Sequence, residues 1–580
     1  MGKTDSTEAL VQDAAYVNGE IIENAYVQPA QALLILGGKI VAVGTNKDVA
    51  AVTPVGVKTI DLKGAVVIPG LIDNHPHLLH FAAFKAPLVD IQDAASHEEI
   101  IERIRVRAAE TPKGNWIMCT PIGDAHYFQR KSYKTLKEGT FPNRTVLDQA
   151  TSDHPVGIQA WALVLPNIAS FNSKALEILG ITKDTPDRVS DVFIEKDEHG
   201  IPTGIVRGHV TNYYNTDPYW QKLAALMPPV IQPELLYKSL VDAMAGYNAM
   251  GVTAIHESHA MDISHVDFYK LLKAQNALSL RVQCSHELEP SALGGDKPQD
   301  LDGINARLRY ALDDTDLEDD WLRICGITTC AFGSSYCGYF AEKRGYLGPF
   351  GERTTGKRQI DAAKIEAAVD FCARTGLKLN MLSCSPDEHD EYIHLLKEVK
   401  RKYGIAKLEW LLEHGYVMRP DQPKQLKDLG LDIAVSSSFT YGKGDMIIER
   451  FGEDYISHLN IFRCMFDAGL KPAASMDLGP TSPWEQMQLA VTHTLSSGRS
   501  NANLSQVVSR EQAYEMWTCN GASVIRWRGI GDLAVGSHAD IAIIDRNPIT
   551  CPIESLPQTQ VLRTIVGGKV VYDSESHLQQ

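Results

Sequence analysis

Two histidines, His75 and His77, stand out first because their type and spacing suit metal binding. They follow residues 66–72, a largely apolar run that is rich in β-branched side chains, too short for a helix and typical of a buried strand. Residues two apart on a strand point to the same face, so both imidazoles can aim at one point. Imidazole nitrogen is a common ligand of divalent ions such as zinc, and we therefore predict a metal site at this strand end.

Two further residues of ligand type, His414 and Asp477, each end a short strand-like run later in the chain. With the two earlier histidines they make a mixed imidazole and carboxylate set, which suits zinc, manganese or iron. A bound ion lowers the pKa of water towards neutrality, and an aspartate beside it can take the proton and pass it to a leaving group. We predict a hydrolytic centre with Asp477 as the proton carrier and with the metal ligands His75, His77, His414 and Asp477.

The elements that must position these residues alternate between helix-like and strand-like stretches. Residues 233–250 have a helical pattern that stops at Gly251, where a strand begins, and residues 361–375 form a similar helix ahead of the strand 377–382. About eight such units predict an α/β fold built as a closed (β/α)8 TIM barrel, in which functional side chains lie at the C-terminal ends of the strands.

The two ends of the chain carry a different pattern, that of short strands joined by tight turns. Gly37-Gly38 and Gly567-Gly568 each separate two short apolar runs, which is typical of β-hairpins. Neither end is long enough to form a core alone, so we expect one small β domain built from both termini. The expected domains are this β domain, with residues 1–65 and 530–580, and the barrel, with residues 66–112 and 230–529.

Residues 113–229 interrupt the barrel pattern and are rich in Pro, Asp, Asn and aromatic side chains, which predicts an α+β insertion beside the barrel mouth. Arg207 follows a Pro-Thr-Gly turn in this insertion and could face a substrate pocket. His256, Glu257 and His259 lie at the end of another expected strand, where they could add a metal ligand, contact substrate or simply form a polar rim.

The composition excludes some classes of function. The formal net charge of −16 opposes non-specific binding of nucleic acid, and no apolar run is long enough to span a membrane. The first residues lack the hydrophobic segment of a secretory signal, and the ten cysteines are scattered without a Cys-x-x-Cys pair. We therefore expect a cytoplasmic protein with reduced thiols that acts on a small molecule and, by default for such enzymes, forms a homodimer.

An ordered set of motifs resembles the YtcJ-like branch of the metal-dependent amidohydrolases and spans nearly the whole chain. The motifs are residues 37–44 (GGKIVAVG), 69–77 (PGLIDNHPH), 172–176 (NSKAL), 200–204 (GIPTG), 251–253 (GVT), 413–414 (EH) and 536–545 (GSHADIAIID). The resemblance implies a TIM barrel, a small β domain made from both termini, an inserted domain and one or two divalent metal ions.

Two positions depart from that family's pattern. Family members usually carry a carboxylated lysine on the fourth strand that bridges two metal ions, and Thr328 stands there in this chain. Leu382 stands where the family has a histidine on the fifth strand, and His389 lies several residues too late to replace it. The resemblance and these losses together predict one divalent ion per chain rather than two, with zinc as the first candidate and manganese or iron as alternatives.

The function expected from these residues is hydrolysis of a C–N bond outside peptides, such as an amide or N-formyl group. A second hypothesis keeps the metal but uses it for C–C cleavage, decarboxylation or isomerisation. A third hypothesis is a catalytically inactive barrel that serves as a binding protein. The retained ligand residues argue against the third, because an inactive site has no physical need for them.

Overall fold

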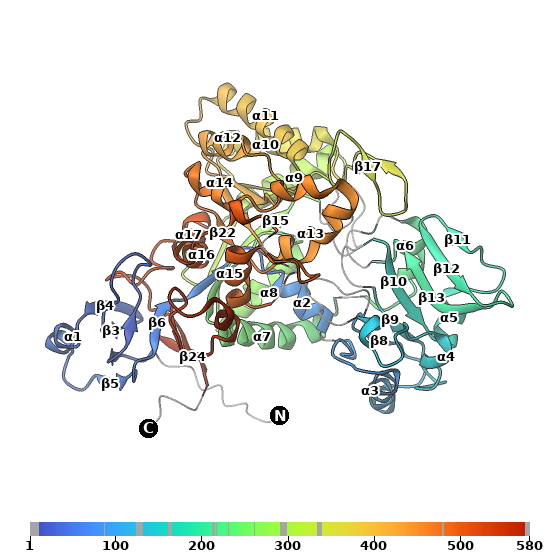
Figure 1. Cartoon of the computed structure of the whole chain (residues 1–580), viewed down its shortest axis with the longest axis horizontal. Coiled ribbons are helices and arrows are strands. Elements are labelled where there is room, and N and C mark those ends of the chain that lie inside the picture. Colours follow the sequence, from blue (N-terminus) through green and yellow to red (C-terminus); the bar gives the residue numbers. More distant parts are fainter. Residues whose placement is uncertain are drawn as a thin grey trace.

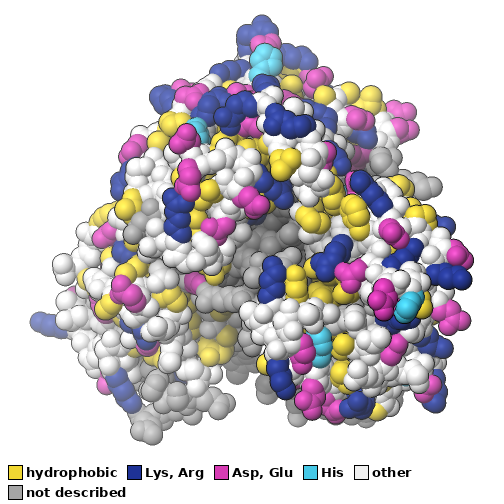
Figure 2. Space-filling view, turned by 45° about the vertical axis from the view of Figure 1, so that its right-hand side comes forward, with side chains coloured by type: hydrophobic (Ala, Val, Ile, Leu, Met, Phe, Trp, Pro, Cys, Tyr) yellow, Lys and Arg dark blue, Asp and Glu magenta, His cyan; other side chains and the backbone are white. Residues whose placement is uncertain are grey.

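The computed structural model describes residues 11–574, apart from positions 86, 123–131, 161–164, 212–214, 216, 230, 260, 290–298, 333–338, 478, 480 and 501. Figure 1 shows three parts, which are a central barrel with its helices, a small β domain to its left and a sheet with helices to its right. Figure 2 shows that one face of the molecule is hollowed near its centre and that Lys and Arg side chains lie on the rim of the hollow.

Eight parallel strands form the central sheet. In spatial order they are β7 (Leu71–Asp73), β14 (Val252–Glu257), β15 (Arg281–Glu287), β16 (Leu322–Cys330), β19 (Leu379–Ser383), β20 (Leu411–His414), β21 (Asp432–Val435) and β22 (Ala473–Ala474). Two hydrogen bonds bring the first and last strands together, since the amide of Asn74 donates to the carbonyl of Ala474 at 3.2 Å and that of Asp477 to the carbonyl of His75 at 3.0 Å. The predicted α/β barrel is confirmed.

Side chains along the barrel strands alternate between the outer face and the interior of the barrel. On β15, Val282 and Cys284 face outward into the main apolar core. Ser285 points into the barrel, where its Oγ accepts a hydrogen bond from Nδ2 of Asn380 at 2.8 Å. This two-residue period gives the barrel an apolar outer face for the helices and a polar interior.

Helices connect the strands and cover the outer face of the barrel (Figure 1). They include α7 (Pro233–Ala249), α8 (Ile263–Ala274), α9 (Leu301–Asp313), α10 (Ala362–Thr375), α11 (Pro386–Tyr403), α12 (Gln422–Leu429), α14 (Phe462–Asp467), α15 (Pro483–Thr492) and α16 (Arg510–Trp517). Local signals set their ends. In α11 the Ser385 side chain accepts from the Glu388 amide, Pro386 opens the first turn, and Gly404 ends the helix with a φ of 66°. Within the described part of the chain, no helix is long and apolar enough to cross a membrane.

The small β domain joins strands from both chain ends, as expected. Its five-stranded sheet contains β2 (Glu20–Ile21), β6 (Val66–Pro69), β23 (Ile541–Ile544), β24 (Val561–Val566) and β25 (Lys569–Asp573). Its four-stranded sheet contains β1 (Ala14–Val17), β3 (Ala32–Leu36), β4 (Lys39–Gly44) and β5 (Lys58–Asp61). One buried apolar cluster, which includes Leu33, Ile35, Ile541 and Ile565, spans both sheets and holds the two termini together.

The strand that the sequence predicts from residue 66 onward is divided at Gly70. Before the division, β6 pairs with β23 in the β domain, whereas after it β7 pairs with β14 in the barrel. The Gly70 amide donates to the Asp540 carbonyl at 2.8 Å, and a Cβ atom at residue 70 would overlap the side chain of Thr253. The chain therefore passes from one domain to the other at a glycine a few residues before His75.

The inserted segment forms its own six-stranded sheet, to the right in Figure 1. Its strands are β8 (Ile117–Cys119), β9 (Val156–Ile158), β10 (Asn167–Phe171), β11 (Arg188–Val189), β12 (Val192–Lys196) and β13 (Pro202–Gly208). Helix α3 (His97–Glu110) is capped by Ser96, whose side chain accepts a hydrogen bond from the Glu99 amide. Ile100 and Ile104 of α3 share a buried cluster with Ile117 and Ile158, so this helix packs on the inserted sheet rather than on the barrel.

Candidate metal centre

The backbone brings four predicted ligands together at the C-terminal end of the barrel strands. His75 and His77 follow β7, His414 ends β20, and Asp477 follows β22. Three of them have left-handed backbone angles, with φ of 52° at His77, 71° at His414 and 50° at Asp477. Such angles are costly for residues other than glycine and persist only where the surrounding structure holds them, which is typical of functional sites.

The side chains of these four residues are spaced as ligands of one ion would be. Nε2 of His75 lies 3.1 Å from Nε2 of His77, and the ligand atoms of His75, His414 and Asp477 all lie within 4.8 Å of one another. The Asp477 carboxylate lies 3.7 Å from Nε2 of His77 and 3.5 Å from Nε2 of His414. Two nitrogens on a tetrahedral zinc ion are about 3.3 Å apart, so the arrangement fits a divalent metal.

A buried carboxylate orients the first histidine. Nδ1 of His75 lies 2.8 Å from Oε2 of Glu413 and 3.1 Å from Oγ of Ser258, so its Nε2 is the atom that faces His77. Burial alone would lower the pKa of His75, but the charge and hydrogen bond of Glu413, together with the charges of Asp477 and Asp73, outweigh burial and raise that pKa to about 9. Burial would likewise raise the pKa of Glu413, and His75 lowers it instead.

The other two imidazoles are held in the form that binds metal. Burial lowers the pKa of both His77 and His414 well below the usual value, and the nearby charge of His75 lowers it further. Both rings are therefore neutral near pH 7, as metal ligands must be. Nδ1 of His414 lies 3.3 Å from Sγ of Cys384, and its Nε2 faces Asp477.

The side chains of His256, Glu257 and His259, at the end of β14, point in different directions. His259 lies in the cluster, with its ring 5.5 Å from that of His75 and 5.3 Å from that of His77. Glu257 faces outward, where Oε1 accepts from the Leu79 amide at 2.9 Å and from Oη of Tyr269 at 2.7 Å. The structure thus brings His259, but not Glu257, to the predicted ligands.

His256 and Arg207 also lie away from the four ligands. His256 is fully buried, neither of its ring nitrogens has a hydrogen-bond partner among the described residues, and burial lowers its pKa to about 3. Arg207 lies on β13 of the insertion, 41% exposed, with Nε 3.4 Å from the Glu195 carboxylate. A substrate contact by either residue stays a prediction.

The two departures from the family pattern lie where the sequence places them, at the barrel strands. Thr328 is buried in the barrel, where its Oγ1 lies 3.2 Å from Oγ of Ser285 and contacts the Ser258 carbonyl. Leu382 is buried on β19. His389 lies on α11, and its ring contacts Oγ of Ser383 at 2.6 Å and the Val417 carbonyl at 3.1 Å. Neither Thr328 nor Leu382 offers a strong metal ligand.

Sequence reasoning missed three residues that surround the site. Cys384 follows Leu382 by two positions, and strand alternation could have placed it beside His414. Glu287 ends β15, and its Oε2 lies 3.2 Å from Nδ1 of His259. Lys443, on α13 (Ser438–Phe451), is 2% exposed with its Nζ 4.4 Å from the centre of the Phe439 ring. No sequence signal marked it, because a lysine on a helix is usually solvated.

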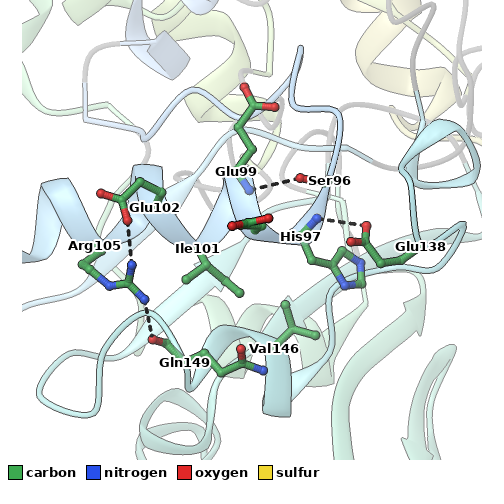
Figure 3. Close-up of a pocket in the computed structure, with 10 residues that line it drawn as sticks. Ser96, His97, Glu99, Ile101, Glu102, Arg105, Glu138, Val146 and Gln149 are labelled. Carbon is green, nitrogen blue, oxygen red and sulfur yellow. Dashed lines mark hydrogen bonds and ion pairs between the residues drawn. The ribbon is translucent and has the colours of Figure 1, made fainter.

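A separate hollow of about 810 Å³ lies on the insertion beside α3 (Figure 3). Its lining residues bind one another or cap the helix, since Arg105 pairs with Glu102 at 2.6 Å and the His97 amide donates to Glu138 at 3.0 Å. The ligand cluster of the described residues lies in the barrel instead. The barrel strand ends are therefore the candidate functional site.

Comparison with known proteins finds matches over nearly the whole chain. The model of the Amidohydrolase family matches residues 58–572. The N-substituted formamide deformylase of Arthrobacter pascens is 26% identical over 94% of this chain and 95% of its own. The putative amidohydrolase YtcJ of Bacillus subtilis is 22% identical over 89% of this chain and 90% of its own. The crystal structure of a metal-dependent hydrolase from Pyrococcus horikoshii has a TM-score of 0.70 and 21% identity, and the match covers 94% of this chain and 99% of that one.

Proposed function

The chain belongs to the amidohydrolase family, and from this premise we propose that it hydrolyses a non-peptide C–N bond, of the amide or N-formyl kind, in a small molecule. The family match confirms the resemblance that the motifs indicated, and with it the hydrolase class. The N-formyl part of the proposal is supported by the Arthrobacter pascens deformylase, which aligns over 94% of this chain and is named for N-substituted formamides.

The observation that carries the proposal is the convergence of His75, His77, His414 and Asp477 from three separate strand ends. Three of these residues have left-handed backbone angles, which cost energy in residues other than glycine and are frequent at functional sites. All four side chains are at least 95% buried, with exposed fractions of 3%, 5%, 5% and 1% in that order. A buried polar set of this kind is stable when a ligand such as a metal ion satisfies it.

In the proposed reaction, the ion and the side chains of the protein have different roles. A divalent ion bound by these residues would lower the pKa of water and polarise a carbonyl group. Asp477, whose carboxylate faces both His77 and His414, would take a proton and return it to the leaving nitrogen. Glu413 and Cys384 would hold the rings of His75 and His414 so that their ligand nitrogens keep a fixed direction.

We propose one ion per chain, because Thr328 and Leu382 replace the two residues that would hold a second. Zinc, manganese and iron all suit imidazole and carboxylate donors, and zinc is the first candidate. The same ion would also serve C–C cleavage, decarboxylation or isomerisation, and the loss of the bridging lysine at Thr328 keeps that alternative open.

The test compares the wild-type protein with the double variant His75→Ala, His77→Ala, each offered zinc, manganese and iron. His394→Ala, which changes an exposed residue of α11, serves as the control for loss of a histidine. We expect about one ion per chain, together with hydrolysis of N-formyl amines or aryl amides, in the wild type and the control but not in the double variant.

Two other results would contradict the proposal in different ways. Bound metal without hydrolysis of any amide, but with release of carbon dioxide or C–C cleavage from a carboxylic or keto acid, would favour the lyase alternative. A folded wild-type protein that binds none of the three ions would overturn metal dependence.

A further inference from the structure

His259 is a buried imidazole at the proposed centre that neither the family motifs nor the set of four predicted ligands includes. It follows β14 by two residues and is 5% exposed. Its ring stacks on that of His75 at a centroid distance of 5.5 Å and meets the ring of His77 edge to face at 5.3 Å. A fourth strand end therefore contributes to the same cluster.

The distances from the His75 ring to the other three imidazole rings are close to those expected for ligands of one ion. A ring centre lies about 3.2 Å from a zinc ion that its nitrogen binds, so the centres of two ligand rings lie about 5 Å apart. The rings of His77 and His414 lie 4.7 and 4.9 Å from that of His75, and the two distances to His259 exceed these by less than 1 Å. His259 thus belongs to the cluster by the same measure as the residues that the sequence predicts.

A buried carboxylate contacts Nδ1 of His259, as Glu413 contacts Nδ1 of His75. Oε2 of Glu287 lies 3.2 Å from Nδ1 of His259, and Glu287 is 1% exposed. Histidines that bind metal almost always donate the other ring N–H to a carboxylate, a carbonyl or water, which fixes the tautomer and the ring direction. Because Nδ1 of His259 contacts Glu287, the nitrogen that would bind the ion is Nε2.

We propose that His259 is a further ligand of the same ion, supplied by the end of β14 and held by Glu287. The inference rests on the metal centre of the proposed function but not on its reaction. Four imidazoles and Asp477 make five protein donors, which leaves one position for water or substrate only on a six-coordinate ion. Such coordination is more typical of manganese or iron than of zinc, whose sites are mostly four-coordinate, so a fifth protein ligand would make manganese or iron the first candidate in place of zinc.

The experiment measures cobalt(II) binding to the full-length protein, because the visible absorption of cobalt(II) reports its coordination number without any substrate. The variants are His259→Ala, His259→Gln and Glu287→Gln, and the control is His394→Ala. We expect weak absorption in the wild type and the control. Loss of one ligand in both His259 variants should strengthen the absorption and weaken cobalt(II) binding about tenfold or more, and Glu287→Gln should weaken it about tenfold.

The outcomes separate this inference from the proposed function. If both His259 variants are folded by circular dichroism and bind cobalt(II) with wild-type affinity and spectrum, His259 is not a ligand, whatever the enzyme hydrolyses. If His259→Ala does not fold, the cobalt(II) affinity and spectrum of His259→Gln and Glu287→Gln test the inference instead. Metal binding that depends on His259, in a protein without amidase activity, would support the inference and overturn the proposed reaction.

Discussion

Nδ1 of His75 lies 2.8 Å from Oε2 of Glu413, a residue 338 positions later in the chain, and both side chains are buried inside the barrel. The pair joins the first strand end of the site to the sixth strand of the sheet. The pair orients Nε2 of His75 towards His77. Because Glu413 raises the pKa of His75, the pair also makes the charge of the site depend on pH.

The first prediction concerns this pair in the metal-free protein. Folding raises the pKa of His75 from about 6.5 to about 9. Between these two pH values, His75 therefore keeps its proton in the folded state and loses it in the unfolded state. The stability that the pair contributes is therefore fully present below about pH 6.5 and is lost as pH rises through about 9. The lowered pKa of Glu413 gives the acidic limit, since the contribution is also lost as pH falls through that value.

The measurement is the urea midpoint of the wild type minus that of Glu413→Gln, taken across this pH range. We expect the difference to be largest near pH 6 and to shrink towards pH 9. Glu366→Gln, at an exposed position of α10, should show no such trend. A difference for Glu413→Gln that stays constant with pH would contradict the assigned charge coupling.

The second prediction concerns Asp477 as proton carrier. Asn tolerates left-handed backbone well, so Asp477→Asn should keep the φ of 50° and the fold while it removes the proton acceptor. At saturating metal we expect the turnover number on an amide substrate to fall about 10²-fold or more. Full activity of the metal-loaded variant would exclude Asp477 from proton transfer.

The third prediction tests whether backbone strain is stored at the site. His414 has a φ of 71°, where an alanine side chain is strained and glycine is not. We expect metal-free His414→Gly to be more stable than His414→Ala by about 0.5–1 kcal/mol in urea unfolding. The same comparison at His394, inside helix α11, should have the opposite sign, because glycine weakens a helix by about 1 kcal/mol. Equal signs at the two positions would argue against strain at His414.

The fourth prediction concerns the junction between the β domain and the barrel. Gly70→Ala would place a methyl group against the side chain of Thr253, and we expect a loss of about 1–3 kcal/mol in the free energy of unfolding. Gly246→Ala is the matched control, because a Cβ at this exposed position of α7 would meet no atom of the described residues within 4 Å. It should stabilise the protein by about 0.5–1 kcal/mol. A neutral Gly70→Ala would show that the junction can move.

Much of the fold and the grouping of the candidate ligands could be predicted because they depend on local patterns. The His75-x-His77 spacing and the apolar run before it indicate a strand end with two ligands on one face. Alternating helical and strand patterns indicate the barrel, and the barrel rule then gathers His414 and Asp477 at the same end. Matching hairpin patterns at the two termini indicate the shared β domain.

The directions of individual side chains were decided only by the tertiary structure. Glu257 and His259 are two apart, and an extended strand would send both to one face. However, β14 ends at Glu257, and the Ser258 amide donates to the His256 carbonyl at 2.9 Å. This turn leaves Glu257 facing Tyr269 and brings His259 to the predicted metal ligands.

The partners of the ligands also come from the tertiary structure. Glu287 lies beside His259, and Cys384 beside His414, because neighbouring strands of the barrel end at the same level. By itself, the sequence determined which residues could bind a metal and on which kind of fold. Strand register and the position at which each strand stops decided which of them meet and which side chains contact the Nδ1 atoms of the imidazoles. Both features are set by packing between segments far apart in the chain.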